Sequence, residues 1–119
     1  RGPGIEAARG EWIVLTNADN YFMSGWLDLV SRYTNDPAVG MIYWNCVNNL
    51  WQWSARDSFL ARGKIDLSCV AVRSEISKKI GFPFREYDGD WDYIAACKNE
   101  VEKQGLRTNC IPCVLCVHN

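Results

Sequence analysis

The run Trp12-Ile-Val-Leu-Thr16, followed at once by Asn17-Ala-Asp-Asn20, is the stretch of sequence that decides the fold. The run is apolar or β-branched throughout and shows no polar alternation, which is typical of a strand buried on both faces. Such strands occur mainly in parallel sheets that carry helices on both sides. We therefore expect a strand over residues 12–16 with parallel neighbours and a polar turn at its carboxyl end.

Further along the chain, helix and strand signals follow one another. Ser24 is a candidate N-cap for a helix that stops before Asp36-Pro37. The apolar face of this helix consists of Trp26, Leu29, Val30 and Tyr33. Apolar runs predict two further strands, over 39–44 and 67–72, with a polar loop or hairpin over 45–62 between them.

The remaining segments complete one domain. The elements predicted there are a short helix over 5–9, a helix beginning at Ser74 and closed by Gly81, a loop over 84–89, a helix over 90–104 and an extended segment over 108–117. Alternation of helix and strand predicts an α/β fold in a single domain over residues 1–119. Too few strands surround residues 12–16, so we expect a sheet edge completed from upstream of Arg1, by a second copy or by a companion chain.

The bulk composition excludes several classes of function. Of the 119 residues, 48% are hydrophobic and 23% are charged, and the net charge is −1. Because no strong positive field is present, nucleic acid is not an expected partner. The apolar stretches are too short to span a bilayer, and the residues at the start of the sequence do not lead us to expect a signal peptide. The six cysteines are expected to be reduced thiols, which favours a cytoplasmic protein, either free or at the cytoplasmic face of a membrane.

Asp19 is the first candidate functional residue. In open α/β sheets, ligands bind outside the carboxyl ends of the strands, and a carboxylate there is an oxygen ligand for Mg²⁺ or Mn²⁺. Such an ion would in turn neutralise phosphate oxygens. The alternative interpretation is that the Asn-Ala-Asp-Asn sequence only ends a strand and starts a turn.

A second candidate is the acidic group Asp88-Gly-Asp-Trp-Asp92 at a predicted helix start. Mutual repulsion of three carboxylates is expected to raise the pKa of at least one, which suits a general base acting on a hydroxyl. Trp91 offers a flat face for stacking on a sugar. The alternative is helix capping, since acidic side chains favour the first turn of a helix.

The C-terminal stretch carries a third group, Cys110, Cys113, Cys116 and His118. The C-x-x-C-x-x-C spacing resembles zinc or iron–sulfur ligation, which would make the chain a metal-binding or interaction module. The apolar residues between the cysteines favour instead a strand with buried thiols.

Taken in order, these segments resemble the later half of a family 2 glycosyltransferase with the GT-A fold. The matching stretches are Arg1-Gly-Pro-Gly-Ile5, Ala8-Arg-Gly-Glu-Trp12, Ile13 to Asn20, Ser24-Gly-Trp-Leu27, residues 67–81, Gly89-Asp-Trp-Asp92 and Gly105 to His118. They are similar to the family's Arg-Asn-x-Gly-Ile segment, its Asp-x-Asp strand, its Glu-Asp-x-Asp motif and its closing strand with a metal-binding His. The resemblance implies a partial GT-A mixed sheet flanked by helices.

The resemblance also implies roles for individual residues. Asp19 and His118 would hold Mn²⁺ or Mg²⁺, while Arg1, Asn17 and Asp19 would contact the diphosphate of a nucleotide-sugar donor, possibly a UDP-sugar. Asp90 would be the catalytic base that deprotonates a glycan or other hydroxyl acceptor, with inversion at the anomeric carbon. Trp91 and Asp92 would form the acceptor site.

Several departures from the family pattern are visible. The family's first strands and helix, which hold the nucleotide base, have no counterpart here, and Gly2 and Pro3 stand in place of the usual Asn and its neighbour after Arg1. Asn17 stands in place of the first Asp of Asp-x-Asp, and Gly89 stands in place of the Glu before the base. A non-catalytic sugar-binding domain that uses Trp51, Trp53 and Trp91 is a further alternative, because tryptophan rings stack on sugar faces.

Overall fold

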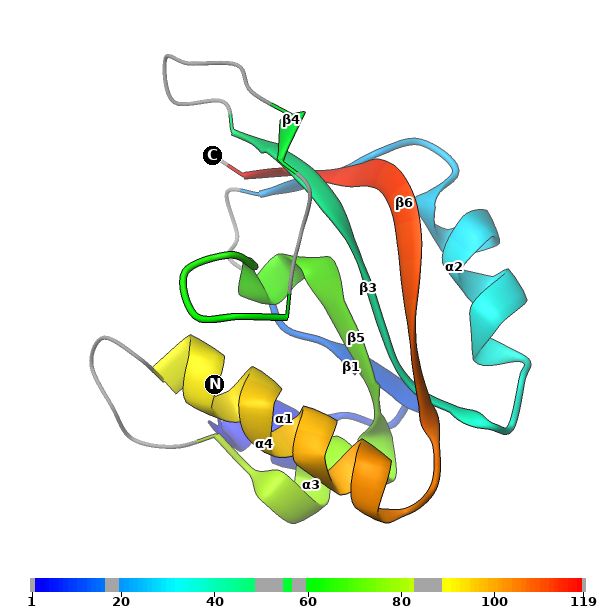
Figure 1. Cartoon of the computed structure of the whole chain (residues 1–119), viewed down its shortest axis with the longest axis vertical. Helices are drawn as coiled ribbons and strands as arrows, with labels where there is room; N and C mark the ends of the chain where they lie inside the picture. The colour runs from blue at the N-terminus through cyan, green and yellow to red at the C-terminus, as the bar shows by residue number, and fades with distance from the viewer. Residues whose placement is uncertain (1, 17–19, 49–54, 57–59, 83–88, 119) are drawn as a thin grey trace.

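The chain folds around one mixed sheet with helices on both faces (Figure 1). The computed structural model describes residues 2–16, 20–48, 55–56, 60–82 and 89–118. The strands are β1 (Trp12–Val14), β2 (Tyr21–Phe22), β3 (Val39–Asn48), β4 (Ala55–Arg56), β5 (Val70–Arg73) and β6 (Arg107–His118). The helices are α1 (Gly2–Ala7), α2 (Trp26–Thr34), α3 (Ser74–Ile80) and α4 (Gly89–Lys103), with a 3-10 turn η1 (Leu67–Cys69).

The strand order is β1-β5-β3-β6-β2, and β4 pairs with the end of β3. The β3–β6 pair is parallel, whereas every other described pair is antiparallel. The expected mixed sheet flanked by helices is therefore confirmed. Among the described residues, no helix is both long and apolar enough to cross a membrane.

Two hydrophobic clusters lie on opposite faces of this sheet. Helices α1, α3 and α4 close the first cluster, which includes Ile5, Met41, Ile76, Tyr93 and Val101. Helix α2 covers part of the second cluster, which includes Val30, Ile42, Trp44, Ile111 and Cys116. Figure 1 shows α2 on one side of the sheet and α1, α3 and α4 on the other. Because both faces are covered, central strands can be apolar without alternation.

The expectation for residues 12–16 is only partly correct for burial and is wrong for pairing. Strand β1 ends at Val14, Ile13 is its one buried residue, Trp12, Val14 and Leu15 are half-buried, and Thr16 is exposed. Ile13 is buried in the first cluster, whereas Trp12 and Val14 pack against the second. However, β1 pairs with β5 in antiparallel register, with Ile13 opposite Val72, and no described strand pairs with its outer edge. Burial on both faces requires helices above and below the sheet, and an antiparallel neighbour satisfies that condition as well as a parallel one.

The other strand predictions hold with changes at their ends. Strand β3 continues past Trp44 to Asn48, and its end pairs with β4 to form the described part of the predicted hairpin. The predicted strand over 67–72 begins instead as η1. The side chain of Asp66 accepts a hydrogen bond from Ser68 N at 2.9 Å, and this local bond favours a tight turn over an extended start. The extended segment over 108–117 is confirmed as β6.

The predictions of α2, α3 and α4 are confirmed in position but not in the caps of α2 and α3, whereas the short helix predicted over 5–9 lies instead at Gly2–Ala7. The N-cap of α2 is Gly25 at φ 80°, not Ser24. The N-cap of α3 is Arg73, while Ser74 is the first residue of that helix and its hydroxyl donates to the carbonyl of Gly10. Gly81 ends α3 at φ 68°, a positive value that glycine adopts without steric cost because it has no Cβ atom.

Helix α4 is tied to α3 by a charged contact. Lys79 Nζ lies 2.9 Å from Glu100 Oε1, and Gln104 Nε2 donates to Glu100 Oε2 at 3.2 Å. The hydrogen bond from Lys79 holds the pKa of Glu100 below its ordinary value. The ion pair therefore joins the C-terminal half of α4 to the end of α3.

Gly40 lies where β3 passes closest to α4. A Cβ atom at this position would lie 3.0 Å from Val101 Cγ2 and 3.1 Å from Leu106 Cδ1. We therefore expect Gly40→Ala to lower the free energy of unfolding by about 1–3 kcal/mol, since overpacking forces neighbouring side chains to shift. Urea denaturation measures this change. Gly4→Ala is the matched control, because no atom lies within 4 Å of a Cβ built in that helical position. Equal losses for the two variants would contradict the explanation.

Candidate functional site

The candidate site lies at the sheet edge formed by β2 and β6. Strand β2 pairs with β6 in antiparallel register, with Tyr21 opposite Val117 and Phe22 opposite Cys116. Met23 N extends the ladder by donating to Leu115 O at 2.8 Å. On the other side of β6, His118 stands in register with Asn48 at the end of β3. The end of β6 is therefore held between two strands.

This pairing brings two distant parts of the sequence together. Tyr21 lies opposite Val117 in the antiparallel pair. The residue before Tyr21, Asn20, therefore lies beside the residue after Val117, which is His118. Asp19 and Asn17 lie outside the described residues, as do Arg1, Trp51, Trp53 and Asp88. The side chain of His118 also lies outside the description. Hence the backbone places Asn20 beside the end of β6. The side chains of Asp19 and His118, the predicted metal ligands, lie outside the described part of the structure.

A polar cluster lies directly behind this edge. Asn20 Nδ2 donates to Ser68 Oγ at 3.2 Å, and Ser68 Oγ lies 3.3 Å from Cys116 Sγ. The Ser68 hydroxyl also makes a hydrogen bond with the carboxylate of Asp66. A hydroxyl has one proton, so Ser68 donates either to Asp66 or to Cys116 at any moment. The cluster links η1 to both strands of the edge.

The first turn of α4 holds the predicted base and acceptor residues. Gly89 is buried and Asp90 is exposed. Trp91 is half-buried and packs against the first hydrophobic cluster, so only part of its ring is open to a ligand. Asp92 Oδ1 lies 3.9 Å from Arg62 Nη2, with 30% of the Asp92 side chain exposed. The acidic residues of this turn also lie at the favourable end of the helix dipole.

The segment over 60–66 connects the two parts of the site. Arg62 reaches Asp92 on α4, and four residues later Asp66 caps η1, whose Ser68 contacts Asn20 and Cys116. In Figure 1, this segment lies between the first turn of α4 and the edge formed by β2 and β6. The structure thus arranges the predicted base and the Asn20 edge around one described segment.

The positions of the cysteines can be compared with the alternative hypothesis of a Cys/His metal-binding module. Cys110 and Cys113 are exposed, whereas Cys116 is buried. Cys110 stands opposite Tyr43 and Cys116 opposite Cys46, so the two are separated by three β3 positions, roughly 10 Å at the usual rise of a strand. A zinc ion needs each sulfur within about 2.3 Å. Within the described part of the chain, no group of three His, Cys, Asp or Glu side chains could hold a metal ion.

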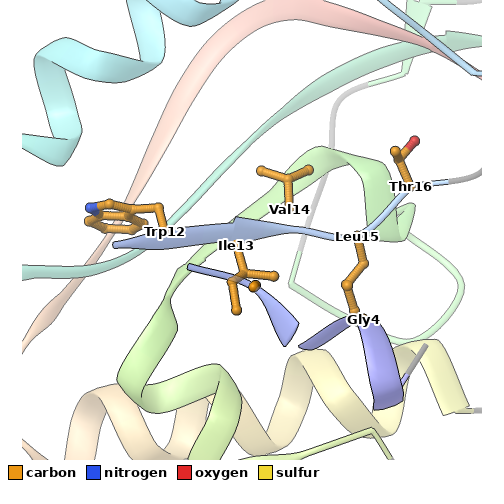
Figure 2. Close-up of a pocket in the computed structure, with 7 residues that line it drawn as sticks. Gly4, Trp12, Ile13, Val14, Leu15 and Thr16 are labelled. Carbon is orange, nitrogen blue, oxygen red and sulfur yellow. The ribbon is translucent and has the colours of Figure 1, made fainter. Parts of the chain in front are cut away.

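A groove runs along the outer edge of β1 toward the same region. Its volume is about 430 Å³, and residues 12–16 form one wall while Gly4 and Ala8 of the α1 segment form the other. Figure 2 shows Leu15 directed toward α1, with Val14 and Thr16 directed to the opposite face. The groove ends at Thr16, the last described residue before Asn17.

Several residues of this site did not stand out in the sequence. Asp66, Ser68 and Arg62 occur in a segment predicted as loop and strand, and their contacts depend on residues far along the chain. The one local signal is Asp-x-Ser before an apolar run, which is typical of a capped turn. Cys46 and Cys69 gave no signal, because their meeting with Cys116 arises only from strand register.

The fold and the site together define an α/β protein with a polar cluster behind the β2–β6 edge and a first turn of α4 that exposes Asp90. In comparisons with known proteins, the chain matches no protein-family model and no curated protein.

Proposed function

We propose that this chain is the metal- and acceptor-binding part of an inverting glycosyltransferase that uses a nucleotide-sugar donor. The observation that supports this proposal most strongly is the β2–β6 pairing. It brings Asn20, the neighbour of Asp19, to the end of β6, where His118 stands. This pairing supports the proposal that Asp19 and His118, which are far apart in the sequence, act at one sheet edge.

In this proposal, Asp19 and His118 hold Mn²⁺ or Mg²⁺. A carboxylate oxygen suits both ions, and the Asn20 amide is already engaged with Ser68 and so contributes to positioning. The bound ion would neutralise the negative charge of the donor diphosphate. Arg1 and Asn17 would bind the donor beside the metal ion, at the carboxyl end of the strand that precedes Asn17.

Asp90 is the proposed general base. Its carboxylate is exposed in the first turn of α4, so an acceptor hydroxyl can reach it. Asp90 accepts the hydroxyl proton as the acceptor oxygen attacks the anomeric carbon, and the bond to the nucleotide diphosphate breaks on the opposite side. This single displacement inverts the anomeric configuration. Trp91 and the Arg62–Asp92 pair would bind the acceptor beside the base.

The outer edge of β1 is a surface where a partner strand could pair with this chain. No described strand covers this edge, and an unpaired strand invites another strand to pair with it. We propose that a companion segment, either a second copy or another chain, completes the sheet there and the donor pocket with it. Nucleotide-sugar donor and hydroxyl acceptor are the proposed small partners, in a cytoplasmic protein.

Calorimetric titration with UDP tests this function. We expect UDP to bind in the presence of Mn²⁺ and not after removal of divalent ions with EDTA, because the ion offsets diphosphate charge at the site. Asp19→Ala and His118→Ala should each weaken Mn²⁺ binding at least about tenfold, measured by loss of the free-ion EPR signal, since each removes one of two protein ligands.

Asp28→Ala is the matched control for charge, because Asp28 is an exposed carboxylate on α2 to which the proposal assigns no role. It should leave both Mn²⁺ and UDP binding unchanged. Wild-type protein that binds neither Mn²⁺ nor UDP would contradict the proposal for this chain. Stoichiometric zinc or iron in the purified protein, lost on Cys→Ser substitution, would favour the metal-module alternative.

A further inference from the structure

The outer edge of β1 carries backbone groups that point away from the sheet. Ser74 N donates to Glu11 O at 2.8 Å, and Ile13 lies two residues further along in the same register with β5. In an antiparallel pair, hydrogen-bonded positions alternate with positions whose N–H and C=O groups point to the other side. Glu11 and Ile13 therefore bond toward β5. The N–H and C=O groups of Trp12 and Val14 point outward, where no described strand pairs with β1.

These outward groups lack the usual protection of an edge strand. Natural edge strands carry charged side chains, proline or bulges that prevent further pairing. Residues 12–16 include neither a charged residue nor a proline, and β1 pairs with β5 without a register shift. A Cβ atom at Gly10 would lie 3.4 Å from Trp12 O, so the glycine leaves that outward carbonyl uncovered. The edge is thus open to another strand.

The groove beside β1 provides space for the side chains of such a strand. It has a volume of about 430 Å³ and lies between residues 12–16 and two small residues, Gly4 of α1 and Ala8 just after it. Figure 2 shows Leu15 directed toward α1 and Val14 directed to the opposite face. A strand paired with β1 would therefore place alternate side chains beside α1 and beside the second hydrophobic cluster.

We propose that β1 pairs with β1 of a second copy of this chain, in antiparallel register with Ile13 on the twofold axis. In this register, Trp12 of each copy lies opposite Val14 of the other. Both residues present outward N–H and C=O groups, so each such pair exchanges both of its hydrogen bonds. A strand whose outward groups are symmetric about its centre is complementary to itself, as a twofold interface requires.

The side chains in this register agree with a second copy as the occupant. A twofold axis perpendicular to the sheet keeps equivalent faces of both copies on the same side. Trp12 and Val14, both half-buried, then cover each other on the face of the second cluster. On the other face, Glu11 lies opposite Leu15, so like charges do not meet across the axis. This inference narrows the companion proposed above to one occupant and holds whether or not the chain transfers sugars.

Sedimentation equilibrium measures this association directly. Stable interfaces bury about 800 Å² per partner, and one short strand pair is smaller, so we expect a reversible dimer. The mean mass should rise with protein concentration from 13.6 kDa toward twice that value. The samples contain neither Mn²⁺ nor UDP, so the result is independent of the proposed function. A mass of 13.6 kDa at every concentration would overturn the proposal and leave this edge to a different chain.

The Val14→Pro variant tests whether β1 forms the interface. Proline lacks the outward N–H group but removes no bond to β5, because Val14 N points away from that strand. We expect the dissociation constant of the dimer to rise at least about tenfold, since the twofold pair loses this hydrogen bond on both sides. Val14→Ala is the matched control and should have a smaller effect, because it retains the N–H group. Unchanged association of folded Val14→Pro, checked by circular dichroism, would overturn the proposal.

An engineered disulfide tests the register. The starting protein carries Cys110→Ser and Cys113→Ser, because both of these thiols are exposed. Ile13 would face its own copy in a non-hydrogen-bonded pair, with Cα atoms about 4.5 Å apart, within the range of a disulfide. Ile13→Cys should therefore give a covalent dimer with oxidised glutathione. The Cα atoms of Val14 would lie roughly 8 Å apart, so Val14→Cys should not. A covalent dimer of Val14→Cys but not of Ile13→Cys would overturn the axis at Ile13.

Discussion

Replacing Trp44 with alanine is expected to lower the free energy of unfolding by about 3–5 kcal/mol, the usual cost of truncating a large buried aromatic side chain. Trp44 has no exposed surface and belongs to the second hydrophobic cluster. Its ring meets Trp26 of α2 edge-on, with centroids 5.7 Å apart. Loss of the side chain would open a cavity between the central strand and the helix that covers it. Small domains are stable by only about 5–15 kcal/mol, so the variant should unfold at much lower urea.

Trp44→Phe separates burial from hydrogen bonding at the same position. The Trp44 Nε1 atom is buried and has no described hydrogen-bond partner, and an unpaired buried donor costs about 1–3 kcal/mol. Phenylalanine keeps much of the apolar surface and removes this donor, so we expect a clearly smaller loss than for alanine. Leu27→Ala on the exposed face of α2 should change stability by less than about 0.5 kcal/mol. Equal urea midpoints for Trp44→Ala and Leu27→Ala would contradict the buried role of Trp44.

The Asp90→Asn variant is expected to show the largest effect on activity. If Asp90 is the general base, the substitution should lower kcat for nucleotide release from a sugar nucleotide and acceptor by about 10²–10⁴-fold. The asparagine amide cannot take up the hydroxyl proton, although it occupies nearly the same volume. Donor and Mn²⁺ binding should be unchanged, because Asp90 lies on α4 and not on the β2–β6 edge. The measurement is UDP release with wild-type and variant protein across a panel of UDP-sugars and hydroxyl acceptors.

Two comparisons distinguish a base from a helix-stabilising residue. Removing one acidic charge from the first turn costs about 0.3–1 kcal/mol through the helix dipole, which is too small to unfold the protein. Glu102→Gln makes the same charge change at the other end of α4, where Glu102 pairs with Lys98, and should leave the rate unchanged. A residue that only stabilises the helix would, when replaced, lower the stability of the protein and leave the turnover of the folded protein unchanged. Normal turnover by Asp90→Asn would show that the base is another residue.

Local signals were sufficient to predict most elements of the fold. The helical period from Trp26 to Tyr33, the apolar runs at 39–44 and 108–117 and the glycine at 81 each act through neighbours in sequence, and the structure confirms the elements they predict. Strand β2 was not predicted, because Tyr21–Phe22 carries too short a pattern to be distinguished from a loop. The Asp66 cap was also missed, so the start of the 67–72 segment was wrong.

Part of the candidate site could also be predicted from local sequence, and part depends on which strands pair. Asp90, Trp91 and Asp92 share one helix turn, so their proximity follows from their spacing alone. The approach of Asn20 to the end of β6 and the contact of Ser68 with Cys116 depend on which strands pair and in what register. A polar motif at the end of a predicted strand does not carry that information.

The stretch from Trp12 to Thr16 shows what the sequence determines and what the tertiary structure determines. Its composition alone predicted a strand covered on both faces, because burial of apolar side chains on both sides of a strand is favourable. The structure has that arrangement over Trp12–Val14, with Ile13 buried and its two neighbours half-buried. The tertiary structure alone decided that β5 runs antiparallel beside it and that no described strand pairs with its other edge. It also decided that Cys46, Cys69 and Cys116, far apart in sequence, share one hydrophobic cluster. Pairing partner and register come from the combined packing of helices and strands, whereas burial of an apolar run is a property of the run itself.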